Sequence, residues 1–206
     1  MSPNRLAGLA VLVLAFGATS FGQVNELSAT FGRTFVSTQS IQGANFFNPN
    51  VRFGNEETVG LNYARLFKSW AGMGFRAEVP FAFVIDMDLN SGTNIPENYK
   101  AFYLAPSFRT NFFNSSSVTP WVSFGGGFAH YRPAGHGLYT GVPFQGSHTT
   151  SGALQFGVGF DVWPWHRWGF RFEARDFNSG MPDLGVDVGR TRQNNYYVGG
   201  GVIRRF

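Results

Sequence analysis

The chain has 206 residues, a formal net charge of +4 and a mean hydropathy of −0.10. This composition excludes a bundle of membrane-spanning helices, which needs runs of about 18 or more apolar residues, and the chain has no block of lysine or arginine typical of a nucleic-acid-binding protein. Aromatic residues make up 17% of the chain and charged residues only 14%, a combination that suits a water-exposed surface poorly.

The first 22 residues have the features of a secretory signal peptide. Arg5 supplies the positive charge, residues 6–18 form an apolar segment too short to span a bilayer, and Ser20-Phe21-Gly22 places small residues before a cleavage point. We therefore expect residues 1–22 to be removed on export and residues 23–206 to form one domain. The chain contains no cysteine, so no disulfide framework is predicted.

Strict alternation of apolar and polar residues follows the expected signal peptide. In Trp168–Arg175 every second residue is apolar and the others are glycine or charged, which indicates a strand with two different faces. Most segments with this alternation are long enough to cross a bilayer, since a tilted transmembrane strand needs about 9–11 residues. The pattern predicts eight strands, at Asn25–Val36, Glu57–Phe67, Ala71–Ile85, Tyr99–Phe112, Val118–Tyr131, Gly152–Val162, Arg167–Phe177 and Asn195–Phe206.

The connections between these strands alternate in length. Long connections rich in glycine, proline, asparagine and serine are expected at 37–56, 86–98, 132–151 and 178–194, and short ones at 68–70, 113–117 and 163–166. An up-and-down barrel puts its long loops at the extracellular end and its short turns at the periplasmic end. The sequence therefore predicts an all-β protein, an eight-stranded antiparallel up-and-down transmembrane β-barrel.

Alternation alone also fits a soluble, lipocalin-like barrel with its apolar face inward. Glycine separates the two cases. The charged face carries glycine pairs such as Gly125 and Gly127, whereas the other face is rich in phenylalanine. The narrow interior of an eight-stranded barrel accommodates glycine beside long ionic side chains, and a wall of phenylalanine suits lipid. We expect a structural, polar network in the interior, formed by Arg76, Glu78, Arg109, Asp161, Arg171, Glu173 and Arg175.

All five tryptophans lie in or beside the predicted short turns. Indole favours the headgroup region of a membrane, where the ring is half buried and its N–H stays hydrated. A tryptophan can also pack near a strand end in any sheet, and this alternative stays open. The expected interfacial aromatic girdle consists of Trp70, Trp121, Trp163, Trp165 and Trp168.

The final strand ends in an aromatic residue, Phe206, with Val202, Val198 and Tyr196 on the same face. With Thr119–Tyr131, Gly157–Trp163 and Trp168–Phe177, this tail resembles the bacterial outer-membrane β-barrel family that includes the transmembrane domain of OmpA, OmpX and the opacity-type proteins. The resemblance covers residues 24–206 and implies that Phe206 is an assembly signal read by the barrel-assembly machinery. Arg204 departs from the family pattern, which has an apolar residue there.

No catalytic, cofactor-binding or metal-binding residue is predicted. Lipid A deacylases of the same fold have a His-x-Ser arrangement, but His130 is followed two residues later by Arg132. Residues Asp86–Glu97 alternate oxygen-bearing side chains as an EF-hand loop does, although glycine is seventh rather than sixth, and calcium binding stays open. The remaining histidines, His136, His148 and His166, show no metal-ligand spacing.

The sequence thus predicts a small, non-enzymatic outer-membrane protein whose four outer loops serve adhesion or contact a ligand or surface. A narrow or gated porin-like channel is the alternative, and a lipid A-modifying enzyme is a third. The expected partners are outer-membrane lipid and lipopolysaccharide together with the assembly machinery, with no cofactor and no nucleic acid, and the barrel is expected to be a monomer. Candidate contact residues of the third long loop are Tyr131, Arg132, His136, Tyr139, Phe144 and His148.

Overall fold

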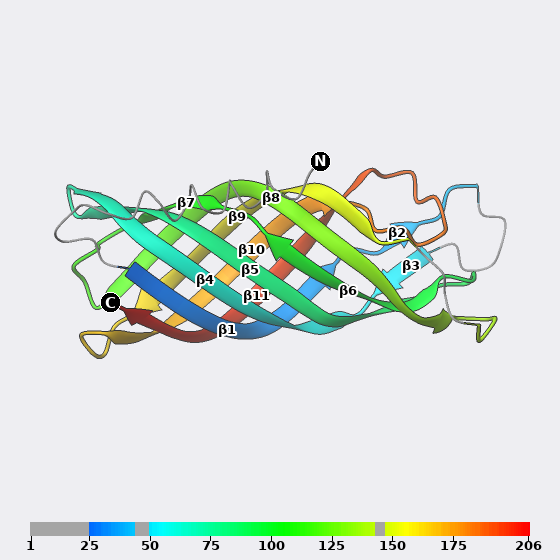
Figure 1. The fold of residues 1–206 in the computed structure, drawn as a ribbon, viewed down its shortest axis with the longest axis horizontal. Helices are drawn as coiled ribbons and strands as arrows, with labels where there is room; N and C mark the ends of the chain where they lie inside the picture. Colours follow the sequence, from blue (N-terminus) through cyan, green and yellow to red (C-terminus); the bar gives the residue numbers. More distant parts are fainter. Residues whose placement is uncertain (1–24, 44–49, 143–146) are drawn as a thin grey trace, which may run out of the picture.

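The computed structural model describes residues 25–43, 50–142 and 147–206. The expected signal peptide, residues 1–22, and Phe144 lie outside these ranges. The described chain is a closed, tilted β-barrel (Figure 1), and it contains no helix long and apolar enough to cross a membrane.

In an extended strand successive side chains point to opposite faces, so the alternating pattern sorts apolar and polar side chains to the two sides while the backbone pairs with neighbouring strands. Neighbouring strands pair antiparallel around a ring with eight positions, in the order β1, β4, β5, β6 with β7, β8, β9, β10 and β11. The prediction of an eight-stranded antiparallel barrel is confirmed. The strands are β1 (Asn25–Val36), β2 (Gln39–Ser40), β3 (Asn50–Phe53), β4 (Asn55–Trp70), β5 (Met73–Asn90), β6 (Pro96–Leu104), β7 (Ser107–Asn111), β8 (Val118–Gly137), β9 (Thr149–Val162), β10 (Trp168–Gly180) and β11 (Arg192–Arg205).

The fourth position of the ring is divided, where a single strand was expected at residues 99–112. The break between β6 and β7 falls at Ala105-Pro106, opposite Pro80 of β5. Neither proline has a backbone N–H to donate to the ladder. The pairing is bridged instead by the N–H of Ala105, which donates to the carbonyl of Pro80, and by the N–H of Gly126, which donates to the carbonyl of Pro106.

The first and last strands close the ring. The partners of β1 and β11 run from Glu26 with Arg205 to Val36 with Asn195. Asn25 and Phe206 extend this ladder, because the N–H of each donates to the carbonyl of the other at 2.9 Å. The barrel therefore has no open edge along this seam, which lies between the blue and dark red strands of Figure 1.

We call the two ends of the barrel the turn end and the loop end. The turn end holds the start of β1, Phe206 and the short connections, and the loop end holds the long ones (Figure 1). The turn between β4 and β5 is Ala71-Gly72, both with positive φ, rather than the expected 68–70. At the loop end β5, β8 and β10 run several residues further than predicted, so the long loops are shorter than their sequence composition suggested.

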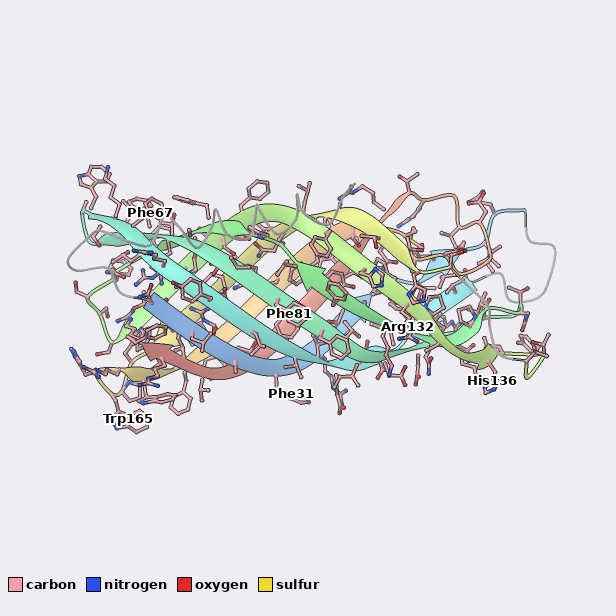
Figure 2. All side chains as sticks on the ribbon, in the orientation of Figure 1. Phe31, Phe67, Phe81, Arg132, His136 and Trp165 are labelled. Carbon is pink, nitrogen blue, oxygen red and sulfur yellow. The ribbon has the colours of Figure 1, made fainter. Side chains whose placement is uncertain are left out.

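Large apolar side chains cover the outside of the barrel wall. Phe31, Phe124 and Phe156 are 57%, 61% and 54% exposed. Figure 2 shows Phe31 and Phe81 in the middle of the barrel, Phe67 and Trp165 towards the turn end, and Arg132 and His136 towards the loop end. The outer wall is thus an apolar belt, and charged side chains lie beyond it.

Candidate functional site

All seven residues of the predicted interior network are buried inside the barrel. Arg171 and Asp161 form a bidentate ion pair: Nε of Arg171 donates to Oδ1 of Asp161 and Nη2 donates to Oδ2, each at 2.8 Å. Glu78 on β5 meets Arg175 of β10 across the interior at 2.9 Å, and Arg109 contacts the same carboxylate at 3.4 Å. The network therefore joins opposite walls of the barrel near its turn end.

Sequence reasoning missed the residue at the centre of this network. Glu26, on β1, is 1% exposed, and its carboxylate contacts four arginines. The sequence did contain a signal for it. Glu26 alternates with outward Leu27 and has the same parity as inward Ser28 and Thr30, which predicts an inward side chain. The contacts run to Arg76 at 3.0 Å, Arg205 at 2.9 Å, Arg171 at 3.9 Å and Arg109.

Trp121 lies inside the barrel, and its assignment to the interfacial girdle is wrong. It is 1% exposed, and the guanidinium carbons of Arg109, Arg171 and Arg175 lie 5.6, 5.2 and 5.0 Å from its ring centre. Position 121 has the same parity as inward Gly125, so the strand pleat points the indole inward. The ring separates and stabilises the arginines through cation–π contacts.

Trp163 also departs from the expected girdle. It is only 9% exposed, and the guanidinium of Arg205 stacks 3.5 Å from its ring centre. It thus closes the interior at the turn end. Trp70, Trp165 and Trp168 are 65%, 60% and 49% exposed on the outside at that end, where a girdle would lie.

The interior changes character towards the loop end, where aromatic and aliphatic side chains replace the ions. Tyr103 stacks on Phe177 at 4.8 Å between ring centres, and Tyr131 meets both Tyr99 and Tyr103 edge-on. These rings are at most 1% exposed. Tyr131, expected in a surface loop, is therefore a core residue, and its hydroxyl contacts Ser179 and Asn195.

The connection between β10 and β11 folds over this aromatic layer as a lid. Leu184 and Val188 are buried, and the carbonyl of Asp187 accepts a hydrogen bond from the N–H of Gln42 at 2.8 Å. Asp183 and Asp187 accept hydrogen bonds from the N–H groups of Gly185 and Gly189, so each forms a tight side-chain turn. The lid closes the interior at the loop end.

The calcium-loop pattern does not form a loop at its start. Asp86, Asp88 and Asn90 belong to strand β5, which pairs there with β3 and β6. Within the described ranges, no group of three or more histidine, cysteine, aspartate or glutamate side chains could hold a metal ion. His136 lies at the loop end near Glu97, 3.9 Å from its carboxylate, and His148 stacks on His130.

Comparison with solved structures identifies the fold. Neisserial surface protein A aligns over 90% of this chain and 98% of its own, with a TM-score of 0.53 and 12% identity. The outer membrane protein OprG from Pseudomonas aeruginosa aligns over 89% and 95%, with a TM-score of 0.54 and 11% identity.

The chain has the fold of the eight-stranded outer-membrane β-barrels. No protein-family model and no curated protein sequence matches it. At this level of identity the similarity establishes the architecture alone.

Proposed function

We propose that this outer-membrane-type barrel is a closed, non-enzymatic scaffold that sits in the bacterial outer membrane and presents its loop end to the surroundings for adhesion or ligand contact. One observation carries the proposal: over the described residues the barrel is apolar outside, and its interior is packed with buried ionic and aromatic side chains. The apolar outer wall suits contact with lipid. Because the interior is packed, the loop end is the surface available for function.

The outer wall supports membrane insertion. Contiguous apolar patches above a few hundred Å² are rare on soluble monomers, yet large apolar side chains are exposed at each of the eight positions of this ring. A closed barrel also satisfies its backbone hydrogen bonds internally, as hydrocarbon demands. Exposed side chains of the belt include Leu27, Phe31, Leu61, Phe108, Phe124, Phe156, Phe172 and Val198.

The filled interior favours a scaffold over a channel. Arg109 and Asp161 in the ionic layer are 0% exposed, and so are Tyr99 and Tyr131 in the aromatic layer. Two consecutive layers of buried side chains oppose the passage of a solute, as is expected for an eight-stranded barrel, whose interior is just filled by side chains. A porin-like conductance would require both layers and the lid to move.

Export and assembly follow the same proposal. Residues 1–22 act as the cleaved signal peptide, and the assembly machinery reads Phe206 at the end of β11. The mature barrel is a monomer in contact with outer-membrane lipid and lipopolysaccharide. Arg132 stands two residues after His130, where the deacylase motif has its serine, and this departure from the motif is the support for a non-enzymatic role.

Epitope accessibility on intact cells tests the location and orientation. We expect a tag inserted after Gly141, at the loop end, to bind antibody on intact cells, and a tag inserted after Ser115, at the turn end, to bind only after the outer membrane is opened. The reverse pattern, or recovery of the protein in the soluble periplasmic fraction, would overturn the proposal.

A further inference from the structure

A cationic groove lies on the outer wall of the barrel, where the apolar belt ends towards the loop end (Figure 2, near Arg132). Its volume is about 320 Å³, and residues of β5, β6, β8 and the segment before β9 line it. None of the lining residues is acidic. Its aromatic and basic lining side chains are those of Phe83, Lys100, Phe102, His130, Arg132 and His148.

Two cations of this groove face each other without a counterion. Lys100 of β6 and Arg132 of β8 are direct cross-strand partners, and both are exposed. Within the described part of the chain neither side chain makes an ion pair or a hydrogen bond, whereas Arg33 on the outer wall lies opposite Glu57. Like charges directly opposite each other destabilise a sheet, so this pair favours a bound anion.

The next pair along the same two strands makes an aromatic floor. Phe102 lies opposite His130, and Phe83 of β5 lies opposite Phe102. The Phe102 ring is 5.9 Å from that of Phe81 and 5.8 Å from that of Phe128, which are belt residues. The groove is therefore continuous with the lipid-facing surface, and an amphiphile fits it better than a free anion.

The histidines add hydrogen-bonding groups at the side of the groove. The His130 and His148 rings stack at 5.7 Å, and Nδ1 of His130 lies 2.7 Å from the hydroxyl of Thr150. That contact fixes the His130 ring and leaves Nε2 for a ligand. The planar fork of arginine and the point charge of lysine are the groups that proteins use for phosphate oxygens.

We propose that this groove binds the phosphorylated headgroup of a glycolipid of the outer leaflet. Lys100 and Arg132 contact the phosphate, and the acyl chains lie along Phe83 and Phe102. The inference rests on the proposed function, because it requires the loop end to face outward from the membrane.

Native mass spectrometry of the folded barrel in a neutral detergent tests this site. The probe is bis-phosphorylated lipid A, compared with its dephosphorylated form and with inorganic phosphate as a competitor. For Lys100→Gln with Arg132→Gln we expect the affinity for the phosphorylated lipid to fall about tenfold or more, since each charged hydrogen bond contributes on the order of one such factor.

The matched control is Arg167→Gln with Arg204→Gln, which removes the same charge at the turn end, where both arginines are exposed. We expect its affinity to stay within about twofold of the wild type, inside the usual effect of surface substitutions. Dephosphorylated lipid should bind weakly and equally to all forms, and inorganic phosphate should not compete. Equal losses in both double variants, no preference for the phosphorylated lipid, or full competition by inorganic phosphate would each overturn the assignment.

The same samples separate this inference from the proposed function. Insertion into lipid vesicles is read from heat-modifiable mobility in a detergent gel. A barrel that does not insert contradicts the proposed function, whereas a barrel that inserts but does not discriminate the phosphorylated lipid contradicts the groove alone.

Discussion

Glu26 is the residue on which the interior charge arrangement depends. With it, the described interior holds four enclosed carboxylates and four enclosed arginines. Each additional buried charge without a partner would cost several kcal/mol. The network is therefore neutral as a whole, although single carboxylates serve several cations. Its members are Glu26, Glu78, Asp161 and Glu173 with Arg76, Arg109, Arg171 and Arg175.

Replacing Glu26 by glutamine should destabilise the barrel by about 3–5 kcal/mol, because it leaves buried arginines without their counterion. Glu173→Ala should cost less, since the Glu173 carboxylate meets one arginine, Arg175 at 3.0 Å, and the hydroxyl of Thr30. Urea unfolding in lipid vesicles, followed by tryptophan fluorescence, measures both. Glu57→Gln, at an exposed position of β4, is the control. Equal midpoints for Glu26→Gln and Glu57→Gln would refute the central role of Glu26.

At this scale the sequence predicted charge positions better than aromatic ones. Arg171 and Glu173 alternate with phenylalanine, so their face follows from period two alone. The prediction for Trp121 was wrong because an indole near a strand end can lie either at the membrane interface or in the barrel interior. Only the parity that Trp121 shares with inward Gly125 distinguishes the two positions. Glu26 follows the alternation too, but its four arginine partners come from β5, β7, β10 and β11 and depend on how the ring closes.

At the scale of elements, glycine makes room for the divided position in the ring. A Cβ on Gly125 would overlap the carbonyl oxygen of Pro106, and one on Gly127 would overlap that of Leu104. Both carbonyls flank the break between β6 and β7. The glycines of β8 thus let its backbone approach the proline-interrupted neighbour closely, which alternation could not reveal.

We expect Gly127→Ala to lower the free energy of unfolding by about 1–3 kcal/mol, the usual cost of overpacking. Gly152→Ala is the matched control, because a Cβ there meets nothing within 4 Å; its effect should stay within about 0.5 kcal/mol. Urea midpoints of the two variants provide the comparison. Similar midpoints would show that β8 does not need the close approach.

The terminal aromatic can be separated from the closure of the ring. Phe206 is 58% exposed, while its backbone bonds to Asn25 do not involve the ring. Phe206→Ala should therefore reduce the amount of barrel assembled in cells several-fold and leave refolding in detergent unchanged. Tyr196→Ala, another exposed aromatic of β11, is the control. Equal assembly of the two variants in cells would contradict a signal at Phe206.

Strand ends were the least predictable elements. Past Ile85 the pleat of β5 shifts at a bulge between Val84 and Met87, so the alternation that marks the strand is interrupted although pairing continues to Asn90. In β8 the polarity of the two faces is reversed near the loop end, where inward Ala129 and Tyr131 alternate with outward His130 and Arg132. The alternation therefore continues beyond the apolar belt, but with the apolar side chains inward, so the polarity rule that marks the rest of the wall does not identify the strand end there.

At the scale of the whole molecule, two stacked interior layers under a lid close the barrel from end to end. In a planar lipid bilayer the wild-type barrel should therefore give no steady ohmic conductance between about −100 and +100 mV. At either limit the voltage supplies about 2.3 kcal/mol for each elementary charge that crosses the membrane. Long-lived, voltage-independent openings would show that water crosses the interior and would favour the channel alternative.

The orientation of the two barrel faces is the claim on which everything else depends, and the absence of cysteine makes it directly measurable. Single cysteines at Phe124, Phe156 and Phe172, which are 61%, 54% and 47% exposed, can carry nitroxide labels in the barrel inserted in lipid vesicles. We predict that dissolved oxygen, which concentrates in lipid, relaxes all three labels strongly and that a water-soluble nickel chelate does not. Labels relaxed by the nickel chelate, or shielded from both reagents inside the protein, would contradict the account.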